Sequence, residues 1–287
     1  MSNVSTLAVV GAGQMGRGIA HVAGVGGYKV RLCDVSDAIL NRALAEIRKN
    51  MQKGVDRGKL TAEAMEQSLA RIQPTTSLEE AGKDADLVIE AVPEDVKMKC
   101  ATFEALDRIC PTHTVLATNT SSLSITEIAA ATNRPDRCIG MHFFIPVHIM
   151  RLVEIIRGLE TTEDTTRVAE QVSKGMGKET VRVNEAPGFA TSRINALIGN
   201  EAFTMLMEGV GTPEDIDKAI KLGLNHPMGP FEMIDMVGLD TRLKILEYLH
   251  QTLGERFRPC PLHIKYVKAG RLGRKTGKGV YDYAPKE

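Results

Sequence analysis

The chain has 287 residues, 43% of them hydrophobic and 25% charged, which is an ordinary composition for a folded protein of about two domains. Its 36 basic and 36 acidic residues cancel, so the chain has no overall positive field to hold nucleic acid or an anionic membrane. No apolar run approaches the ~20 residues that span a bilayer, and the N-terminus lacks a signal-peptide pattern.

Five cysteines are spread widely along the chain, and none lies in a C-x-x-C pair. The odd number and the wide spacing argue against a disulfide framework and against a zinc site. We therefore expect a cytoplasmic protein in a reducing environment, with no metal, no nucleic-acid partner and no membrane partner.

The first half of the chain alternates strand-like and helix-like patterns. Short apolar runs predict strands at residues 6–10, 29–33, 86–92, 114–118, 137–144, 152–156 and 180–183. Apolar residues at helical spacing predict a helix after the first strand and further helices over 36–53, 61–71, 96–110, 125–131 and 161–175. We expect Ser36 and Gly54 to bound the helix over 36–53, and Thr161 with Asp164 to form a capping box. The alternation predicts a Rossmann-type, doubly wound, mostly parallel sheet.

The pattern changes near residues 184–188, where Pro187 and Gly188 mark a short linker. Beyond it only helices are predicted until the last few residues, over 193–208, from a Thr212 cap onward, and over 241–253 and 261–268. The sequence therefore predicts a Rossmann domain over residues 1–184 and an all-α domain over residues 185–287.

A glycine-rich turn, G-A-G-Q-M-G, lies between the first strand and the helix that follows it. This is the G-x-G-x-x-G pattern of dinucleotide-binding units, in the context that the pattern requires. Its first glycine permits the tight turn, the second lets a diphosphate approach the backbone, and the third lets the helix pack on the strand. The helix N-terminus offers unpaired N–H groups to phosphates. The predicted cofactor residues here are Gly11, Gly13, Gln14, Met15 and Gly16.

Asp34 ends the second predicted strand, at about the spacing from the glycines at which such proteins carry an acid for the adenosine ribose. A carboxylate there accepts from the ribose 2′-OH and repels a 2′-phosphate, and the next three residues include no arginine, which favours NAD over NADP. A helix-capping role for Asp34 is compatible with this. A methyltransferase also places an acid after its second strand, but its loop usually lacks the third glycine.

Two predicted strands carry a polar residue inside an apolar run: His142 within G-M-H-F-F, and Glu154 within L-V-E-I-I. A short connection separates the strands, so the two side chains could meet. Oxidation of an alcohol needs a base for the hydroxyl proton, and a carboxylate behind a histidine orients it. A purely structural His–Glu pair would explain the same pattern, and His148, in the connecting loop, is a competing base that we expect to be more exposed.

The segment N-T-S-S, residues 119–122, follows the strand at 114–118. Ligands of open α/β sheets bind outside the carboxyl ends of the strands, where Asn119 or Ser121 could hold a ligand oxygen. The alternative is that these residues form a turn and cap the next helix.

Taken together, these segments resemble the L-3-hydroxyacyl-CoA dehydrogenases, in particular the short single-function 3-hydroxybutyryl-CoA dehydrogenases. The similarity runs essentially from end to end. The matching stretches are VVGAGQMGRGIA, IEAVPED, NTSSLSI, GMHFF-x-P, LVEII, EAPGF, DIDKAIKLG, HPMGPFEMIDMVGLD and GRKTGKGVYDY.

The resemblance implies an oxidoreductase of fatty-acid metabolism that interconverts (S)-3-hydroxyacyl-CoA and 3-oxoacyl-CoA with NAD, with a short-chain acyl-CoA thioester as the expected substrate. It implies a homodimer in which residues 185–287 form the substrate and dimerisation domain. By position it makes His142 the base, Glu154 its orienting partner and Ser121 the donor to the substrate oxygen. The remaining implied contacts are Glu94, Lys99 and Asn119 for the cofactor, and Lys53 and Ser192 for the substrate.

Two positions depart from the family pattern. Ile145 stands where the family often has asparagine in H-F-F-N-P, and Ser192 stands where it often has asparagine in P-G-F-x-x-N-R. A serine hydroxyl can still donate a hydrogen bond, but over a shorter reach. Two other functions remain open on the same motifs: an NAD-dependent dehydrogenase of a free hydroxy acid or sugar acid, and a non-catalytic NAD-binding protein.

Overall fold

The computed structural model of the chain describes residues 4–283. By their internal contacts the residues form two compact units, Met1–Ala186 and Pro187–Glu287. Each unit has its own hydrophobic core.

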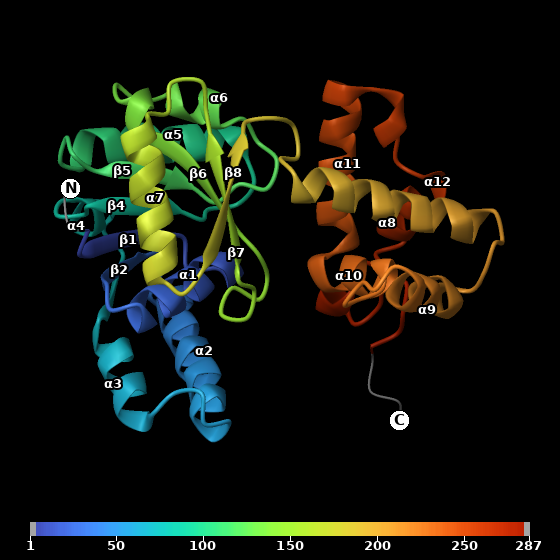
Figure 1. Cartoon of the computed structure of the whole chain (residues 1–287), viewed down its shortest axis with the longest axis horizontal. Coiled ribbons are helices and arrows are strands. Elements are labelled where there is room, and N and C mark those ends of the chain that lie inside the picture. The colour runs from blue at the N-terminus through green and yellow to red at the C-terminus, as the bar shows by residue number, and fades with distance from the viewer. Residues whose placement is uncertain (1–3, 284–287) are drawn as a thin grey trace. The chain divides into compact units, whose positions relative to one another are not determined.

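The first unit is built on one eight-stranded sheet with the order β3-β2-β1-β4-β5-β6-β7-β8 (Figure 1). Neighbouring strands are parallel except β6 and β7, which are antiparallel. The predicted Rossmann-type sheet is therefore confirmed. The strands are β1 (Thr6–Val10), β2 (Lys29–Cys33), β3 (Ile72–Thr75), β4 (Leu87–Glu90), β5 (Val115–Thr118), β6 (Cys138–Phe143), β7 (Leu152–Arg157) and β8 (Glu179–Asn184).

Helices cover both faces of this sheet because residues along the central strands alternate between two cores. Leu7 and Val9 of β1 pack in one core, with side chains of α1 (Gln14–Val25), α2 (Asp37–Asp56), α3 (Ala62–Ala70) and α7 (Glu163–Gly175). Ala8 and Val10 of the same strand pack in the other, with side chains of α4 (Leu78–Gly82), α5 (Val96–Ile109) and α6 (Ile125–Ala129).

The second unit is helical. Its helices are α8 (Thr191–Met207), α9 (Pro213–Gly223), α10 (Pro230–Val237), α11 (Leu239–Leu253) and α12 (Pro261–Lys268). As predicted, Thr212 caps α9 by accepting from the N–H of Asp215. One core gathers around Phe203 and Phe231 and a second around Leu249. Within residues 4–283, no helix combines the length and the apolar character needed to cross a membrane.

Strand β3 and helix α10 were not predicted. Pro74 lies inside β3. A proline argues against a strand in the sequence, because it has no N–H to donate to a sheet. The strand tolerates it because β3 is at the edge of the sheet. Helix α2 is longer than predicted: Gly54 does not end it, and the helix continues to Asp56. Val55 packs against the core, so tertiary contacts extend the last turn.

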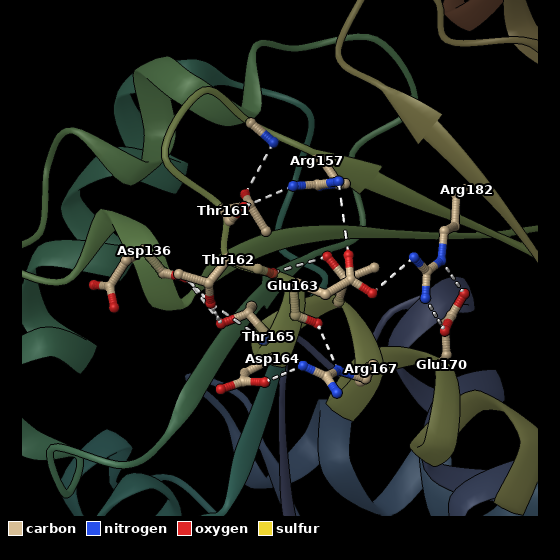
Figure 2. A network of polar contacts seen from close by, with 12 residues as sticks. Asp136, Arg157, Thr161, Thr162, Glu163, Asp164, Thr165, Arg167, Glu170 and Arg182 are labelled. Atoms are coloured by element: carbon tan, nitrogen blue, oxygen red, sulfur yellow. Dashed lines mark hydrogen bonds and ion pairs between the residues drawn. The ribbon is translucent and has the colours of Figure 1, made fainter.

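The predicted capping box of α7 is wrong by one residue (Figure 2). Thr162 is the cap, and its hydroxyl accepts from the N–H of Thr165 at 3.3 Å. The hydroxyl of Thr161 instead donates to the carbonyl oxygen of Cys138 in β6 at 2.7 Å and accepts from the N–H of Gly158 at 2.9 Å. Because the Thr161 hydroxyl is bound to the buried carbonyl oxygen of Cys138, Thr162 is the residue that caps the helix.

Candidate active site

The glycine-rich loop follows β1 and begins α1, as predicted. Gly11 has φ +97°, and a Cβ there would lie 2.6 Å from the carbonyl oxygen of Ala91. A Cβ on Gly16 would lie 1.6 Å from the carbonyl oxygen of Gly11, so helix and loop touch at that point. Gly13, by contrast, borders open space and begins α1 without a side-chain cap. The loop therefore offers uncapped N–H groups at an approachable surface, which suits a diphosphate.

Asp34 lies at the end of β2 and holds the same loop. Its Oδ2 accepts from the N–H of Ala12 at 2.7 Å, and its Oδ1 accepts from the N–H of Val35 at 2.8 Å. The sequence did not predict this bond to the glycine-rich loop, which joins residues 22 positions apart. The carboxylate thus fastens the glycine-rich loop to the end of β2.

His142 and Glu154 form a buried pair on neighbouring antiparallel strands. The β6–β7 register places the two residues directly opposite each other. Nδ1 of His142 lies 2.8 Å from Oε2 of Glu154, and both side chains are buried. The predicted contact is confirmed. In the tautomer that carries its proton on Nδ1, this nitrogen donates to the carboxylate and Nε2 is the acceptor nitrogen of the ring.

The loop after β5 carries Ser121 and is held from two sides. Oε1 of Glu94 accepts from the Thr120 hydroxyl at 2.6 Å and from the N–H of Ser121 at 2.9 Å. Oδ1 of Asn119 accepts from the N–H of Phe143 at 3.0 Å, which links the loop to the strand of His142. The backbone around Ser121 is therefore fixed in place by neighbouring elements.

Lys99, predicted as a cofactor contact, is fully buried in α5. Its ammonium lies 2.8 Å from Oε1 of Glu90 and 3.6 Å from Oε2 of Glu94. The side chain of Lys99 has a carboxylate partner and is 0% exposed, so it presents no surface to a ligand in this structure. Direct contact between Lys99 and a cofactor stays a prediction.

These groups gather at one edge of the sheet because they follow, or lie near, the carboxyl ends of parallel strands. The glycine-rich loop follows β1, Asp34 follows β2, Glu94 lies beyond β4, and Ser121 lies beyond β5. The strand order reverses between β1 and β4, which is where open α/β sheets bind ligands.

Other predicted residues lie outside this group. Lys53 is exposed near the end of α2, and Ser192 is in α8 of the second unit. His148 is exposed, as expected, and its ring stacks on that of His21 at a centroid distance of 5.4 Å. This stack borders a pocket of about 160 Å³ between α1, α2 and the β6–β7 loop, whose lining includes Arg17.

Burial, aided by the charges of His148 and Lys178, lowers the pKa of His21 to about 4. Lys178 holds the β6–β7 loop by donating to the carbonyl oxygens of Val147 and Met150. Sequence reasoning missed these contacts, because they join residues far apart in the chain. It also missed Glu90, although an acid inside an apolar strand is the signal that pointed to Glu154. Among residues 4–283, no group of three or more His, Cys, Asp or Glu side chains is placed to hold a metal ion.

Comparison with known proteins agrees with this arrangement. The family model described as the NAD binding domain of 3-hydroxyacyl-CoA dehydrogenase matches residues 6–186, and the C-terminal domain model of that family matches residues 188–283. The chain is 50% identical to a probable 3-hydroxybutyryl-CoA dehydrogenase of Bacillus subtilis, over 99% of each chain. It is 45% identical to the 3-hydroxybutyryl-CoA dehydrogenase of Bradyrhizobium diazoefficiens, over 98% of this chain and 96% of the other.

A solved structure shows the same fold. The crystal structure of (S)-3-hydroxybutyryl-CoA dehydrogenase from Ralstonia eutropha matches with a TM-score of 0.93 at 43% identity, covering 98% of this chain and 100% of the other. The glycine-rich loop at the reversal of strand order, with a histidine–carboxylate pair at the same edge, defines an NAD-binding dehydrogenase of the Rossmann class. Within that class, the chain belongs to the 3-hydroxyacyl-CoA dehydrogenase family.

Proposed function

We propose that this enzyme interconverts (S)-3-hydroxybutyryl-CoA and acetoacetyl-CoA with NAD as the hydride carrier. The names of the similar proteins, which are 3-hydroxybutyryl-CoA dehydrogenases, support the short acyl chain. The observation that carries the chemistry is the buried pair of His142 and Glu154 at the edge of the sheet that also holds the glycine-rich loop.

In the oxidation direction, Nε2 of His142 takes the proton of the substrate's C3 hydroxyl. Bound NAD would supply the acceptor for the hydride that leaves C3 as the C3 carbonyl forms. Glu154 accepts from Nδ1–H, holds this tautomer and stabilises the imidazolium. In the reduction direction the imidazolium returns the proton to the oxygen. No other proton acceptor is needed at C3.

Ser121 donates a hydrogen bond to the C3 oxygen. Its backbone is held by Glu94, which supports a fixed direction for the hydroxyl. The glycine-rich loop, from Gly11 to Gly16, receives the cofactor diphosphate, and Asp34 accepts from the adenosine ribose. Glu94, Lys99 and Asn119 complete the cofactor side of the site.

Lys53 contacts a phosphate of the CoA moiety. Its charge acts on His148 at the pocket beside α1, so a basic region lies on that side of the first unit. Ser192, from the second unit, contacts the substrate, and the second unit also forms the contacts of a homodimer. We further propose a cytoplasmic location, supported by five free thiols and testable by cell fractionation.

The test is reduction of acetoacetyl-CoA, followed by the loss of NADH absorbance. His142→Gln should lower kcat by about 10²–10⁴-fold, which is what a general base contributes. Glu154→Gln should lower kcat less, because it removes the orientation of the base and not the base. His113→Gln is the matched control: His113 is exposed and precedes β5, at the opposite edge of the sheet.

Three results of this assay would contradict the proposal. A loss of less than tenfold in His142→Gln would exclude His142 as the base, and a larger loss in His148→Gln would transfer the role to that residue. Equal activity on free acetoacetate would favour a dehydrogenase of free hydroxy acids. Equal rates with NADPH and NADH would contradict the proposed contact of Asp34 with the ribose.

A further inference from the structure

Glu90 is a fully buried acid whose role the motifs do not explain. It ends β4, next to the reversal of strand order, and its carboxylate accepts three hydrogen bonds. Oε1 accepts from the N–H of Val92 at 2.7 Å and from the ammonium of Lys99 at 2.8 Å, and Oε2 accepts from the Thr118 hydroxyl at 2.7 Å. A carboxylate is costly to bury unless it is paired in this way.

Both arms of this network lead to the loop of Ser121. On the first arm, Lys99 lies 3.6 Å from Oε2 of Glu94, and Oε1 of Glu94 holds the Thr120 hydroxyl and the N–H of Ser121. On the second arm, Thr118 is the last residue of β5, three positions before Ser121. The loop is therefore tied to Glu90 at its start through Thr118 and at its end through Lys99 and Glu94.

The charges explain why Glu90 matters to Glu94. The side chain of Glu94 is 37% exposed, so water and the loop compete for its carboxylate. Lys99 is the cation between the two acids. Its ammonium is held by the short contact to Glu90 and also donates to the carbonyl oxygen of Val92 at 3.3 Å. If Glu90 loses its charge, Lys99 is drawn toward Glu94, and the carboxylate that holds Ser121 turns.

We propose that Glu90 is a positioning residue that sets the direction of the Ser121 hydroxyl through Lys99 and Glu94 and through Thr118. It acts without touching substrate or cofactor. This inference rests on the proposed role of Ser121 in binding the C3 oxygen. Small displacements of such a group slow the reaction strongly, because misplacement by about 1 Å can reduce a rate about 10²-fold.

The experiment is a double-mutant cycle between positions 90 and 121, with steady-state kinetics on acetoacetyl-CoA and NADH. Glu90→Gln and Ser121→Ala should each lower kcat by about tenfold or more, and in each variant the fall in kcat should exceed the rise in the KM for NADH. The double variant should be no slower than Ser121→Ala, because Glu90 has nothing left to position. Thr118→Val, which removes one neutral hydrogen bond, should give a smaller loss of the same kind and carries the test if Glu90→Gln does not fold.

The matched control is Asp107→Asn. Asp107 lies on α5, like Lys99, and its side chain and that of its partner Arg134 are 6% and 13% exposed, with an N–O distance of 2.6 Å. Breaking that pair should lower the melting temperature and leave kcat within about threefold. Losses in kcat that multiply in the Glu90→Gln/Ser121→Ala variant would overturn the inference, since they would mean that Glu90 acts independently of Ser121.

The result also separates this inference from the proposed function. If kcat is normal in Glu90→Gln and Thr118→Val but lowered in Ser121→Ala, only the role proposed for Glu90 is overturned. A normal kcat in Ser121→Ala overturns the role proposed for Ser121, and the inference with it. Neither result touches the assignment of His142 as the base, which its own variant tests.

Discussion

At the scale of single residues, two buried histidines of the first unit have opposite surroundings. His142 contacts the carboxylate of Glu154. His21 lies under the ring of His148 and near Lys178, so burial and positive charge together lower its pKa to about 4, below the ordinary 6.5. His21 is therefore neutral throughout the physiological range, whereas His142 has a carboxylate as its neighbour.

The lowered pKa of His21 predicts a pH dependence of stability. Between pH 6.5 and 4 the unfolded chain binds a proton at this position that the folded chain does not, so stability falls as the pH drops through this window. At pH 5 the loss relative to pH 7 should be about 2 kcal/mol. In thermal melts at the two pH values, His21→Gln should lose several degrees less than the wild type. His113→Gln, the exposed control, should behave like the wild type, and an unchanged difference in His21→Gln would contradict the prediction.

At the scale of elements, two buried acids fasten the C-terminal segment of the second unit to its helices. Asp235 in α10 accepts from the N–H groups of Val280 and Tyr281 at 2.8 and 2.9 Å. Asp217 in α9 accepts from the Tyr281 hydroxyl at 2.8 Å. A Cβ at Gly279 would lie 2.0 Å from Oδ1 of Asp235, so this glycine is needed for the close approach. The stretch G-R-K-T-G-K-G-V-Y-D-Y thus holds the C-terminal segment against α9 and α10.

Asp235→Asn should weaken the attachment of the C-terminal segment to α10. An amide offers one acceptor oxygen where the carboxylate offers two, so a buried N–H is left without a partner, at a cost of about 1–3 kcal/mol. We expect a lower melting temperature and faster tryptic cleavage after Lys278. Asp240→Asn is the control, because it breaks only a partly exposed pair with Lys275, worth at most about 1 kcal/mol. Equal effects of the two variants would contradict the special role of Asp235.

At the scale of the whole molecule, hydrogen bonds anchor the end of the first unit where the chain passes into the second. Glu185, just before the second unit begins, accepts from the N–H of Thr126 at 2.8 Å and from the Ser124 hydroxyl, so the connection starts from a fixed point at α6. Large apolar side chains are exposed in the second unit, on α8 and α9 and just beyond their C-terminal ends. They are Ile194, Met207, Val210, Leu222 and Leu224.

The proposed homodimer predicts a particle of twice the chain mass of 31.3 kDa by light scattering. Leu222→Asp should shift the protein toward the monomer, because its side chain is 74% exposed in the second unit. Leu159→Asp is the control, since Leu159 is 79% exposed but belongs to the first unit. A wild-type monomer at micromolar concentration would refute the homodimer, and an equal response of the two variants would refute its location.

Features that depend on neighbours in the chain could be predicted from the sequence alone. The G-x-G-x-x-G turn needs its glycines for local backbone reasons, and Gly11 and Gly16 have the crowded surroundings that the motif implies. The strands β1 and β2 and helix α12 lie where their apolar patterns predicted them. Sequence also predicted the change from an α/β to a helical pattern, because strand and helix periods differ.

Only the tertiary structure decided features that join distant residues. It paired His142 with Glu154 through the β6–β7 register, and it tied Asp34 to the glycine-rich loop. It placed Pro74 in an edge strand, gave the cap of α7 to Thr162, and joined Glu90 to the loop of Ser121 through Lys99. Each of these depends on which buried donor meets which acceptor, and that is fixed by packing across the sheet and not by spacing along the chain.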